Sequence, residues 1–575
     1  MKTAIFNRRS GRKLARYVLT YLLIISVTLF VGCNNRSRNT SSDVSSGTTS
    51  SSNITSTTNL GTGTETTGDS TTDTTTTGTA GGAKPTKYID PLSGNITADS
   101  EVSKVRADAK EIKAPKNSAY LLNPLKGYAE KEAAALRESI LNTGNTEEYY
   151  KITGTKYYVS PSGDDNNPGT SPDKPLRTAE KVSLLPLKAG DAVLFERGGV
   201  YRITQTIVCV EGVIYGSYGK GDKPAIYGSP QNYAADNIWK PTNKKNVWKA
   251  EFPYKQVGSI VFNHGEEVGI LKVAGLDQLN ANTQFYHNGD DGIVYLYCDK
   301  GNPSKVYKDI ELCSEMFIFS IPIRVSNVTI DNLCLKYSGY GAVICWYRNN
   351  NITVTNCEIG FMGGVQSSNV RLGNAIGFWE GNKGLVVEHN WVYQTFDTAI
   401  SPQGFGGVGC VYENISFCNN LLEYNNADYE WFEVKGSEWR NIKCDGNIMR
   451  FTSLGWGTRL NDAGIRGIEG CIRAETTEVT FEKFTFRNNI IDCPGRDIIN
   501  WMLTPEQFAG FDVGNNTVYV KASYRAVYPY NPAFLRGLHL TGTGSVIINA
   551  TNQSELETIW KYWDKSPTSK VYWYD

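Results

Sequence analysis

The chain has 575 residues, so we expect one large domain with appendages, or several domains, rather than a single small core. Its 58 basic and 58 acidic residues balance, and beyond the first 16 residues no basic block is available to neutralise phosphates, which argues against a nucleic-acid-binding protein. The cysteines after Cys33 are scattered without a C-x-x-C pair, and the four histidines lack ligand spacing, so neither a disulfide framework nor a zinc site is indicated.

The N-terminus has the pattern of an export signal. Six basic residues and no acidic residue precede an apolar run of 15 residues over 18–32. A membrane span needs about 20 apolar residues, so this run fits a secretory signal better. The segment "LFVGC" resembles a bacterial lipobox, although Phe30 stands where leucine is usual. The resemblance implies a lipoprotein signal and lipobox over 1–33, with Cys33 lipidated and left as the mature N-terminus after cleavage; the alternative is a plain signal peptide with an incidental cysteine.

Two segments separate this signal from the main domain. Residues 40–82 contain 26 serines or threonines among 43 residues and no aromatic residue, so we expect a disordered linker over 34–84. Such a linker would hold a folded domain away from a membrane. Residues 85–155 are predicted to form a helical extension, because "LKGYAEKEAAALRESILNTG" spaces Ala133, Leu136 and Ile140 on one helical face.

The next stretch carries a family resemblance. "YYVSPSGDDNNPGTSPDKPLRTAEKV" and "KAGDAVLFERGGVYR" resemble the opening of bacterial right-handed parallel β-helix proteins that act on polysaccharides, both pectate-lyase-like and glycoside-hydrolase-like. The resemblance implies an all-β solenoid over 156–525 with an N-terminal helical cap. It does not specify a reaction. Asp164 and Asp165 fall in a Gly/Pro-rich loop and are expected to make turns.

Internal repeats support a solenoid independently. Seven segments share a β-rich run, an asparagine and further apolar residues, with spacings of 24, 34, 30, 27, 42 and 27 residues. Their asparagines are Asn332, Asn356, Asn390, Asn420, Asn447, Asn489 and Asn516. Because asparagine tolerates a left-handed corner and hydrogen-bonds locally, we expect these residues to stack as a ladder. The longer coils carry their excess at 361–380, 394–413 and 455–480, where a binding face is expected.

Two regions depart from the repeat. Residues 220–310 contain two hairpin patterns, one turning at Asp291-Gly292, and are predicted to form a small antiparallel insertion. Residues 526–575 are rich in tryptophan and tyrosine and are expected to cap the C-terminal end.

Three strands align after their corner asparagines: "GNAIGFWE", "DTAISPQ" and "ADYEWFE". The alignment predicts one inward and one outward column, which are Ile376, Ile400 and Tyr429, and Gly377, Ser401 and Glu430. Asp397 precedes its strand, one coil from Glu430. Since neighbouring strands lie about 4.8 Å apart, the two carboxylates are predicted to reach the separation of about 5–9 Å used in glycoside hydrolysis. The alternative is that Asp397 only forms a turn.

These observations define a candidate site. The predicted catalytic acids are Asp397, Glu430, Glu380 and Asp462. The predicted substrate-binding residues are Trp379, Gln403, Trp431, Lys435, Trp456 and Arg459. Indole rings beside acids suit sugars, whose C–H faces pack on aromatic rings.

Three functions remain open. The first is a glycoside hydrolase that cleaves a polysaccharide by carboxylate acid/base catalysis without a cofactor. The second is a pectate-type lyase, with a base among Lys435, Arg459 and Arg466 and with Ca²⁺. The polygalacturonase pattern is absent from the relevant coils. The third is a glycan-binding solenoid without catalysis. In each case we expect a monomer, lipid-anchored on the extracellular face of a bacterial membrane.

Overall fold

The computed structural model describes twelve segments of the chain, which are residues 125–271, 275–367, 370–404, 409–432, 436–458, 470–474, 479–503, 510–525, 535–538, 547–548, 550–564 and 568–575. The predicted lipidation residue Cys33 and the predicted site residues Lys435, Arg459 and Asp462 lie outside these segments. Among the described residues, no helix is long and apolar enough to cross a membrane.

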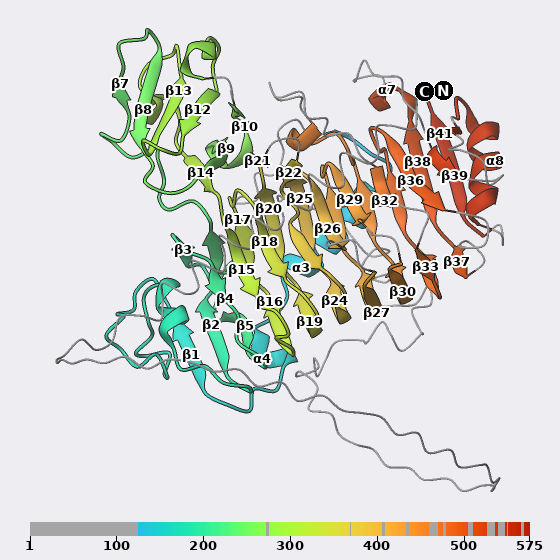
Figure 1. Ribbon diagram of the computed structural model, residues 1–575, viewed down its shortest axis with the longest axis horizontal. Coiled ribbons are helices and arrows are strands. Elements are labelled where there is room, and N and C mark those ends of the chain that lie inside the picture. The colour runs from blue at the N-terminus through green and yellow to red at the C-terminus, as the bar shows by residue number, and fades with distance from the viewer. Residues whose placement is uncertain are drawn as a thin grey trace, which may run out of the picture. The chain divides into compact units, whose positions relative to one another are not determined.

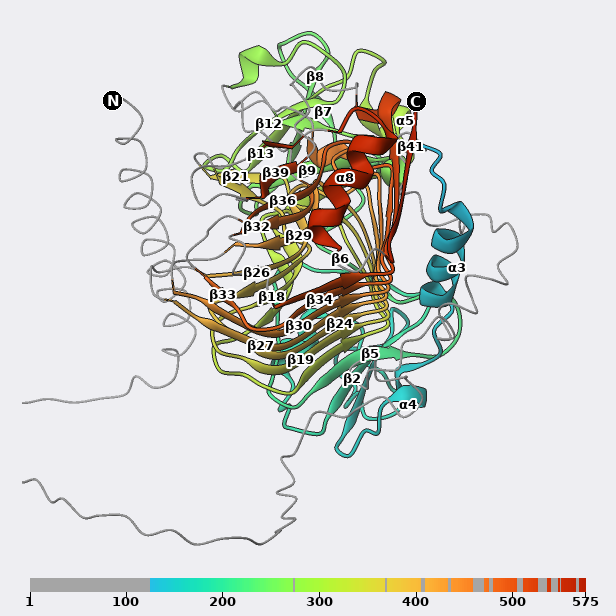
Figure 2. The same cartoon turned by 90° about the vertical axis from the view of Figure 1, so that its right-hand side faces the viewer.

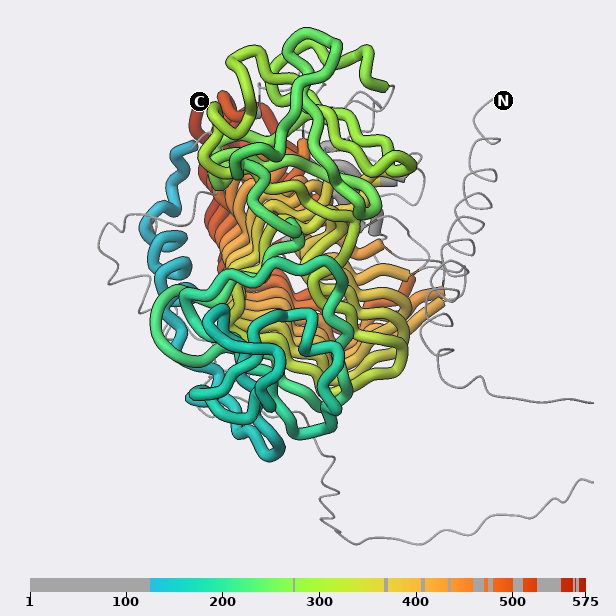
Figure 3. Tube along the Cα trace, turned by 90° about the vertical axis from the view of Figure 1, so that its left-hand side faces the viewer, coloured from blue at the N-terminus to red at the C-terminus, as the bar shows by residue number. Residues whose placement is uncertain are grey.

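Three long sheets wind around a shared apolar core (Figures 1 and 2). From β2 (Ala192–Glu196) to β39 (Leu535–Leu538) the chain visits the sheets, which we call A, B and C, in that order. Strands of successive coils pair in parallel, as do β16 (Val328–Asp331), β19 (Asn350–Thr355) and β24 (Lys383–Glu388) of sheet A. Figure 3 shows the successive coils stacked behind the N-terminal one. The fold is a right-handed parallel β-helix, as the sequence predicts.

Sheet A has ten strands along its main path, and β33 (Thr480–Phe481) also pairs with β30. The ten are β1 (Lys156–Val159), β2 (Ala192–Glu196), β5 (Ile214–Tyr218), β16 (Val328–Asp331), β19 (Asn350–Thr355), β24 (Lys383–Glu388), β27 (Val411–Cys418), β30 (Glu438–Asp445), β34 (Phe484–Arg487) and β37 (Phe511–Gly514).

Sheet B is parallel throughout. Its strands are β3 (Val200–Arg202), β6 (Ala225–Tyr227), β17 (Cys334–Lys336), β20 (Glu358–Met362), β25 (Trp391–Thr395), β28 (Leu421–Glu423), β31 (Ile448–Arg450), β35 (Ile490–Asp492), β38 (Thr517–Lys521) and β41 (Lys570–Tyr574).

Sheet C carries most of the described candidate residues, and only its last pair is antiparallel. Its strands are β4 (Ile207–Val208), β15 (Phe317–Ile321), β18 (Gly341–Cys345), β23 (Ile376–Trp379), β26 (Thr398–Gln403), β29 (Ala427–Trp431), β32 (Gly470–Ala474), β36 (Asp497–Leu503), β39 (Leu535–Leu538) and β40 (Ile547–Ile548).

A ladder of asparagines joins sheets A and B. The side-chain amide of Asn390 donates to Oδ1 of Asn420 at 3.1 Å, and the same bond repeats through Asn447, Asn489 and Asn516. All five side chains are buried, and buried polar groups need hydrogen-bond partners. Each amide therefore also donates to a backbone carbonyl inside the corner, as Asn390 does to the carbonyl of Val354.

Two of the seven predicted ladder positions are wrong. Asn332 and Asn356 lie one residue earlier in the coil, where the backbone is left-handed with φ of 59° and 55°. Cys357 takes the ladder position in that coil and donates its backbone N–H to Asn390. Asparagine suits both positions, so the repeat pattern alone did not separate the ladder from the left-handed turn.

The two ends and one side of the solenoid are covered. At the first coils, the 3-10 helix η2 (Glu180–Leu184) places Val182 in the core. Helix α3 (Glu130–Leu141) lies along the outer face of sheet B and buries Ala133, Leu136 and Ile140 (Figure 2). Helix α8 (Gln553–Trp563) lies across the last coil.

The described residues also form the short helices α4 (Thr146–Tyr149), α5 (Pro303–Val306) and α7 (Ala522–Arg525) and the 3-10 helices η3 (Asn263–Gly265) and η4 (Leu276–Gln278). All cysteines from Cys209 to Cys493 are free thiols, and all but Cys410 are buried.

The predicted antiparallel insertion is present beside the first coils (Figure 1). One sheet contains β7 (Lys240–Pro241), β8 (Val247–Glu251), β11 (Ile270–Leu271), β12 (Gln284–Asn288) and β13 (Ile293–Tyr297), with β12 and β13 forming the hairpin expected at Asp291-Gly292. A second sheet contains β9 (Val257–Phe262), β10 (Glu267–Val268) and β14 (Ile310–Ser314). Ser259 on β9 donates to the carbonyl of Gly363, which fixes the insertion to the corner before sheet C.

Candidate functional site

The outward face of sheet C presents a continuous column of side chains. The strand register aligns Ile344, Gly377 and Ser401, and aligns Glu430 with Arg473 on the next strand. Ile376, Ile400 and Tyr429 fill the inward column and are fully buried in the core. Both columns agree with the strand alignment predicted from the sequence.

Glu430 is the centre of a polar cluster in this column, which we call the Glu430 cluster: Thr398, Ser401, Gln403, Glu430 and Arg473. Glu430 Oε1 accepts from Arg473 Nη1 at 2.8 Å, and the two side chains are 5% and 20% exposed. Its Oε2 accepts from Ser401 Oγ at 2.8 Å, from Gln403 Nε2 at 3.1 Å and from Thr398 Oγ1 at 3.3 Å. These four donors suit a carboxylate, which only accepts hydrogen bonds.

Asp397 stands at the end of this cluster, directly before β26. Its backbone carbonyl accepts from Ala427 N at 3.2 Å, which fixes the corner to the next coil, and its side chain is half-buried. Because consecutive Cα atoms are about 3.8 Å apart, the Thr398–Glu430 contact places Glu430 Oε2 within about 10 Å of the Asp397 Cα atom. The corner that carries Asp397 therefore adjoins the Glu430 cluster.

Arg371 braces the corner that presents Asp397. It comes from the hairpin of β21 (Val365–Ser367) and β22 (Val370–Leu372), and it is nearly buried. Its guanidinium lies 3.7 Å from the centroid of the Phe396 ring and donates to the carbonyls of Phe396 and Gly457. An arginine with these contacts fixes the backbone immediately before Asp397.

Glu380 lies at the opposite end of the strand. Its backbone N–H donates to the carbonyl of Gln403, the last residue of β26, whereas Asp397 precedes the first residue. Six strand residues at about 3.3 Å each place the two acids roughly 20 Å apart. Even extended side chains cannot bring that pair to the separation of about 5–9.5 Å needed around one glycosidic bond, which corrects their predicted joint action.

One aromatic wall flanks the cluster. Trp379 is in register with Gln403, is half-buried and packs edge-on against Trp346 with ring centroids 4.8 Å apart. Trp346 Nε1 donates to Ser320 Oγ at 2.8 Å, so its ring is held in place. Gln403 thus contacts Glu430 and lies in register with Trp379, and the binding role expected of both stays a prediction.

Two predicted sugar platforms are buried instead. Trp431 follows Glu430 on β29, so strand alternation turns it into the core, where it is 0% exposed and packs on Tyr429 and Phe484. Trp456, in the 3-10 helix η5 (Trp456–Thr458), stacks on Phe396 and donates its Nε1 to the Gln394 carbonyl. The prediction that these two rings line a groove is wrong in this structure.

Sequence reasoning missed Arg473, Thr398 and Arg371. Arg473 lies in a coil that the sequence alignment did not include, although "GCIRA" alternates in a way that turns Arg473 outward. Arg371 had no sequence signal, because its contacts come from a hairpin without a repeat pattern. Within the described segments, no group of three or more His, Cys, Asp or Glu side chains is arranged to hold a metal ion.

A cavity of about 650 Å³ lies on the outer face of sheet B and is lined in part by the link between helices α3 and α4. Its floor contains Lys336, which pairs with Glu358 at 2.7 Å, while Glu358 also accepts from Tyr393. Lys223 donates to Asn332 at the same floor. These charged side chains already pair with each other or with Asn332 at the corner between sheets A and B. We therefore interpret the cavity as the surface on which the α3–α4 link packs.

No family model and no curated protein sequence matched the chain. Several solved structures are similar at low identity. A family 136 lacto-N-biosidase from Eubacterium ramulus is 15% identical with a TM-score of 0.39, covering 68% of this chain and 58% of its own. The chain thus spans little more than half the length of that enzyme.

Two further solved structures are of comparable similarity. A complex of XylC with xylose is 12% identical with a TM-score of 0.41, covering 73% of this chain and 83% of its own. A family 28 exopolygalacturonase from Yersinia enterocolitica is 12% identical with a TM-score of 0.31, covering 65% and 72%.

Proposed function

We propose that this protein is a carbohydrate-active enzyme, a glycoside hydrolase that cleaves a polysaccharide on the outer face of sheet C. The observation that carries the proposal is the Glu430 cluster: a nearly buried carboxylate on an outward-facing column, bound by Arg473 and three neutral donors, with the Asp397 Cα atom within about 10 Å. A buried charge is costly unless it is paired, and Arg473 pairs with Glu430 here. Buried, paired carboxylates of this kind are found at functional sites as well as in structural ion pairs.

The contacts favour different roles for the two acids. Glu430 is surrounded by donors, which fits a carboxylate that acts as nucleophile or as base toward water. Asp397, at the half-buried corner, would supply the proton to the leaving oxygen. Trp379 and Trp346 would hold the C–H face of a neighbouring sugar ring, with Gln403 bonding a hydroxyl.

The proposed location rests on the sequence of the N-terminal segment. Lipidation at Cys33 would anchor the chain at the outside of a bacterial membrane, and the linker over 34–84 would let sheet C reach an insoluble polymer. Extraction of the full-length protein with detergent, and its loss from the membrane fraction in Cys33→Ala, would test this part alone.

The catalytic proposal is tested on plant, algal and host polysaccharides with the full chain. We expect reducing ends to be released without the ultraviolet absorbance of an unsaturated uronate. Glu430→Gln and Asp397→Asn should each lower kcat by at least about 100-fold, as expected for loss of a catalytic carboxylate. Glu413→Gln, an equivalent change on the exposed face of sheet A, should leave the rate unchanged. Full activity in both site variants would refute the assignment.

Two other outcomes identify the competing functions. A Ca²⁺-dependent rise in ultraviolet absorbance would indicate a pectate-type lyase, for which Arg473 is the described cation closest to Glu430. Saturable binding of a glycan without turnover would indicate a binding solenoid.

A further inference from the structure

The cavity of about 650 Å³ beside the α3–α4 link, which we call the link cavity, contains two cations without a carboxylate partner. Arg197 donates to three backbone carbonyls and to the Asn145 side chain. Lys223 donates to the side chain of Asn332, which is a neutral amide. Within the described segments, neither cation lies within salt-bridge distance of a carboxylate. Both positive charges are thus held by neutral groups.

The acids around these cations do not balance them on the cavity floor. Glu358 is already paired with Lys336, so that pair adds no net charge. Asp331 acts electrostatically on both Arg197 and Lys223, but its carboxylate accepts from two hydroxyls and one amide instead. One carboxylate beside two cations leaves an excess of one positive charge among buried groups.

The electrostatics of Lys223 agree with this excess. Its side chain is 5% exposed. Burial, followed by the neighbouring Arg197 charge, lowers the pKa of the Lys223 ammonium from 10.5 to about 8. A buried charge without an opposite partner is costly, and a lysine in that position gives up its proton more readily. At pH 7 the ammonium still holds its proton, so a bound anion would be stabilised there.

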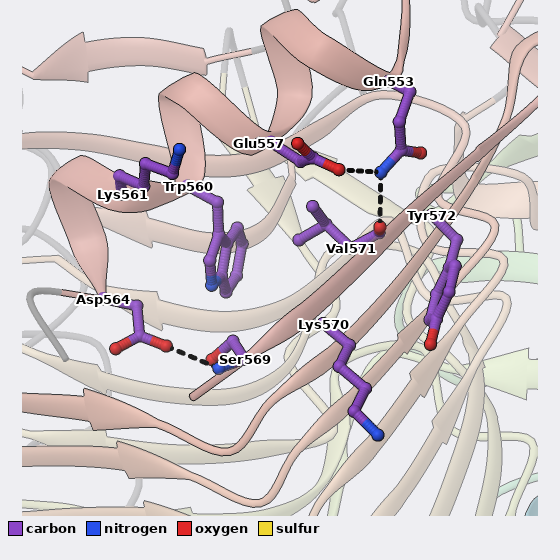
Figure 4. A pocket seen from close by; sticks show the side chains of 9 residues that line it. All are labelled: Gln553, Glu557, Trp560, Lys561, Asp564, Ser569, Lys570, Val571 and Tyr572. Atoms are coloured by element: carbon purple, nitrogen blue, oxygen red, sulfur yellow. Dashed lines mark hydrogen bonds between the residues drawn. The ribbon is translucent and has the colours of Figure 1, made fainter. Parts of the chain in front are cut away.

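The charges at the rim of the link cavity differ from those on its floor. Glu148, Lys220 and Asp222 are exposed, so water screens them. The pocket of about 350 Å³ between helix α8 and strand β41 shows the same situation (Figure 4). Its lysines, Lys561 and Lys570, are exposed and need no bound partner. Lys223 is buried, and that is what distinguishes the floor of the link cavity.

The chemistry of Lys223 selects the ligand. An ammonium group has three donors, and Asn332 takes one of them, so two remain for an acceptor in the cavity. A carboxylate supplies both the acceptors and the missing negative charge, whereas a neutral hydroxyl supplies no charge. The volume lies within the range of about 300–1,000 Å³ that small-molecule sites occupy, so the ligand has room for more than the carboxylate itself.

We propose that the link cavity binds a small organic acid of about the size of a sugar ring, with its carboxylate accepting from the Lys223 ammonium. A uronic acid has this chemistry. The cavity lies on the outer face of sheet B, whereas the Glu430 cluster lies on sheet C. The proposed site therefore does not depend on catalysis at sheet C.

Isothermal titration calorimetry of the full chain at pH 7 tests the proposal. The probes are galacturonate and glucuronate, their neutral counterparts galactose and glucose, and the small anions acetate and phosphate. We expect saturable binding of at least one uronate, no binding of the neutral sugars, and affinity for acetate and phosphate at least about tenfold weaker. Equal affinities for all anions would overturn the assignment of a sugar-sized ligand.

Lys223→Met removes the charge and keeps a side chain of similar shape, so affinity for the uronate should fall at least about tenfold. Lys220→Met is the matched control, because Lys220 lies on the same loop and is exposed, and affinity should stay within about twofold. Glu430→Gln should abolish turnover and retain this binding, which distinguishes failure here from failure of the proposed hydrolase.

The parent chain provides a second test that does not depend on folding of a variant. Affinity should fall as pH rises above about 8, because Lys223 then loses its proton. Burial raises the pKa values of Tyr227 and Cys334, which also line the cavity, away from this range. Three results would overturn the proposal: no binding of any anion, unchanged affinity in a folded Lys223→Met variant, or constant affinity from pH 7 to about pH 9.

Discussion

Glu430 and Arg473 face each other on adjacent strands of sheet C, with their charged atoms 2.8 Å apart. The carboxylate is almost fully buried and the guanidinium is mostly covered, so neither charge is well hydrated. The pair lies on the face that we propose as catalytic. Variants of this pair can distinguish a structural contribution of the two residues from a catalytic one.

Arg473→Met should destabilise the protein by about 1–3 kcal/mol, because it leaves the Glu430 charge without its cation. The double variant Glu430→Gln/Arg473→Met should recover most of that loss, since no charge then remains buried. Urea unfolding of both variants measures this. Lys383→Met breaks the exposed Lys383–Glu413 pair and should cost less than about 1 kcal/mol. Equal losses in the two single variants would contradict the burial argument.

Trp379→Ala should raise KM by about 2–10-fold with a smaller change in kcat. The indole stands beside the cluster and would contact a sugar that is not the one being cleaved, so it contributes to binding more than to the transition state. Steady-state kinetics on the substrate found by the polysaccharide panel tests this. The half-buried Trp248 of the insertion provides the control, because Trp248→Ala lies on a different sheet. A loss confined to kcat would instead place Trp379 next to the reacting bond.

The sequence predicts the coil well and the site only in part. Strand alternation placed Ser401 and Glu430 on the outward column, because a period of two admits only one assignment once Tyr429 is buried. The same rule turns Trp431 inward, and an aromatic side chain beside an acid does not by itself distinguish a sugar platform from a core residue. Arg371 and Arg473 were missed because their contacts join residues 25 to 86 positions apart through hairpins and irregular coils.

Asn447→Ala should cost about 2–4 kcal/mol and so be more destabilising than an ordinary surface change. Asn447 donates to Phe417 O and Asn489 Oδ1 and accepts from both nitrogens of Asn420, all in a buried corner. Its removal leaves several buried groups without partners. Asn441→Gly is the control, since Asn441 bonds Asn414 at an exposed turn and glycine tolerates its left-handed φ of 53°. Equal decreases of the unfolding temperature in the two variants would show that the asparagine ladder contributes no more to stability than an exposed turn does.

His389 should make the protein less stable as the solution becomes acidic. Its ring bonds Asn356 and Ser139, the latter on α3, and burial lowers its pKa from 6.5 to about 3. Between these values the unfolded chain binds a proton that the folded ring refuses, so stability falls as pH drops from about 6.5 toward 3. His389→Asn keeps a residue suited to the left-handed backbone at this position and should remove this dependence. Chemical unfolding at several pH values, compared with the parent chain, measures the difference.

Asp428 should make the stability of the protein depend on pH in the opposite direction from His389. It is fully buried between Asn425 and Thr452, and burial raises the pKa of its carboxyl group from 3.8 to about 8. In the window from about 4 to 8 the folded protein keeps a proton that the unfolded chain has released. Stability therefore falls as pH rises through this window, by up to about 1.4 kcal/mol per pH unit, and levels off above about pH 8.

Asp428→Asn should remove that slope, because the amide keeps the bond from Asn425 and can bond Thr452 without carrying a charge. At pH 8 the variant should be more stable than the parent chain, and below about pH 4 the two should be alike. From about pH 4 to 6.5 the Asp428 and His389 slopes oppose each other in the parent chain, so each single variant exposes the other residue's slope. The difference in unfolding free energy between each variant and the parent isolates the changed group. An Asp428→Asn difference that does not vary with pH would show that Asp428 is ionised inside the fold, held there by its hydrogen bonds rather than neutralised by burial.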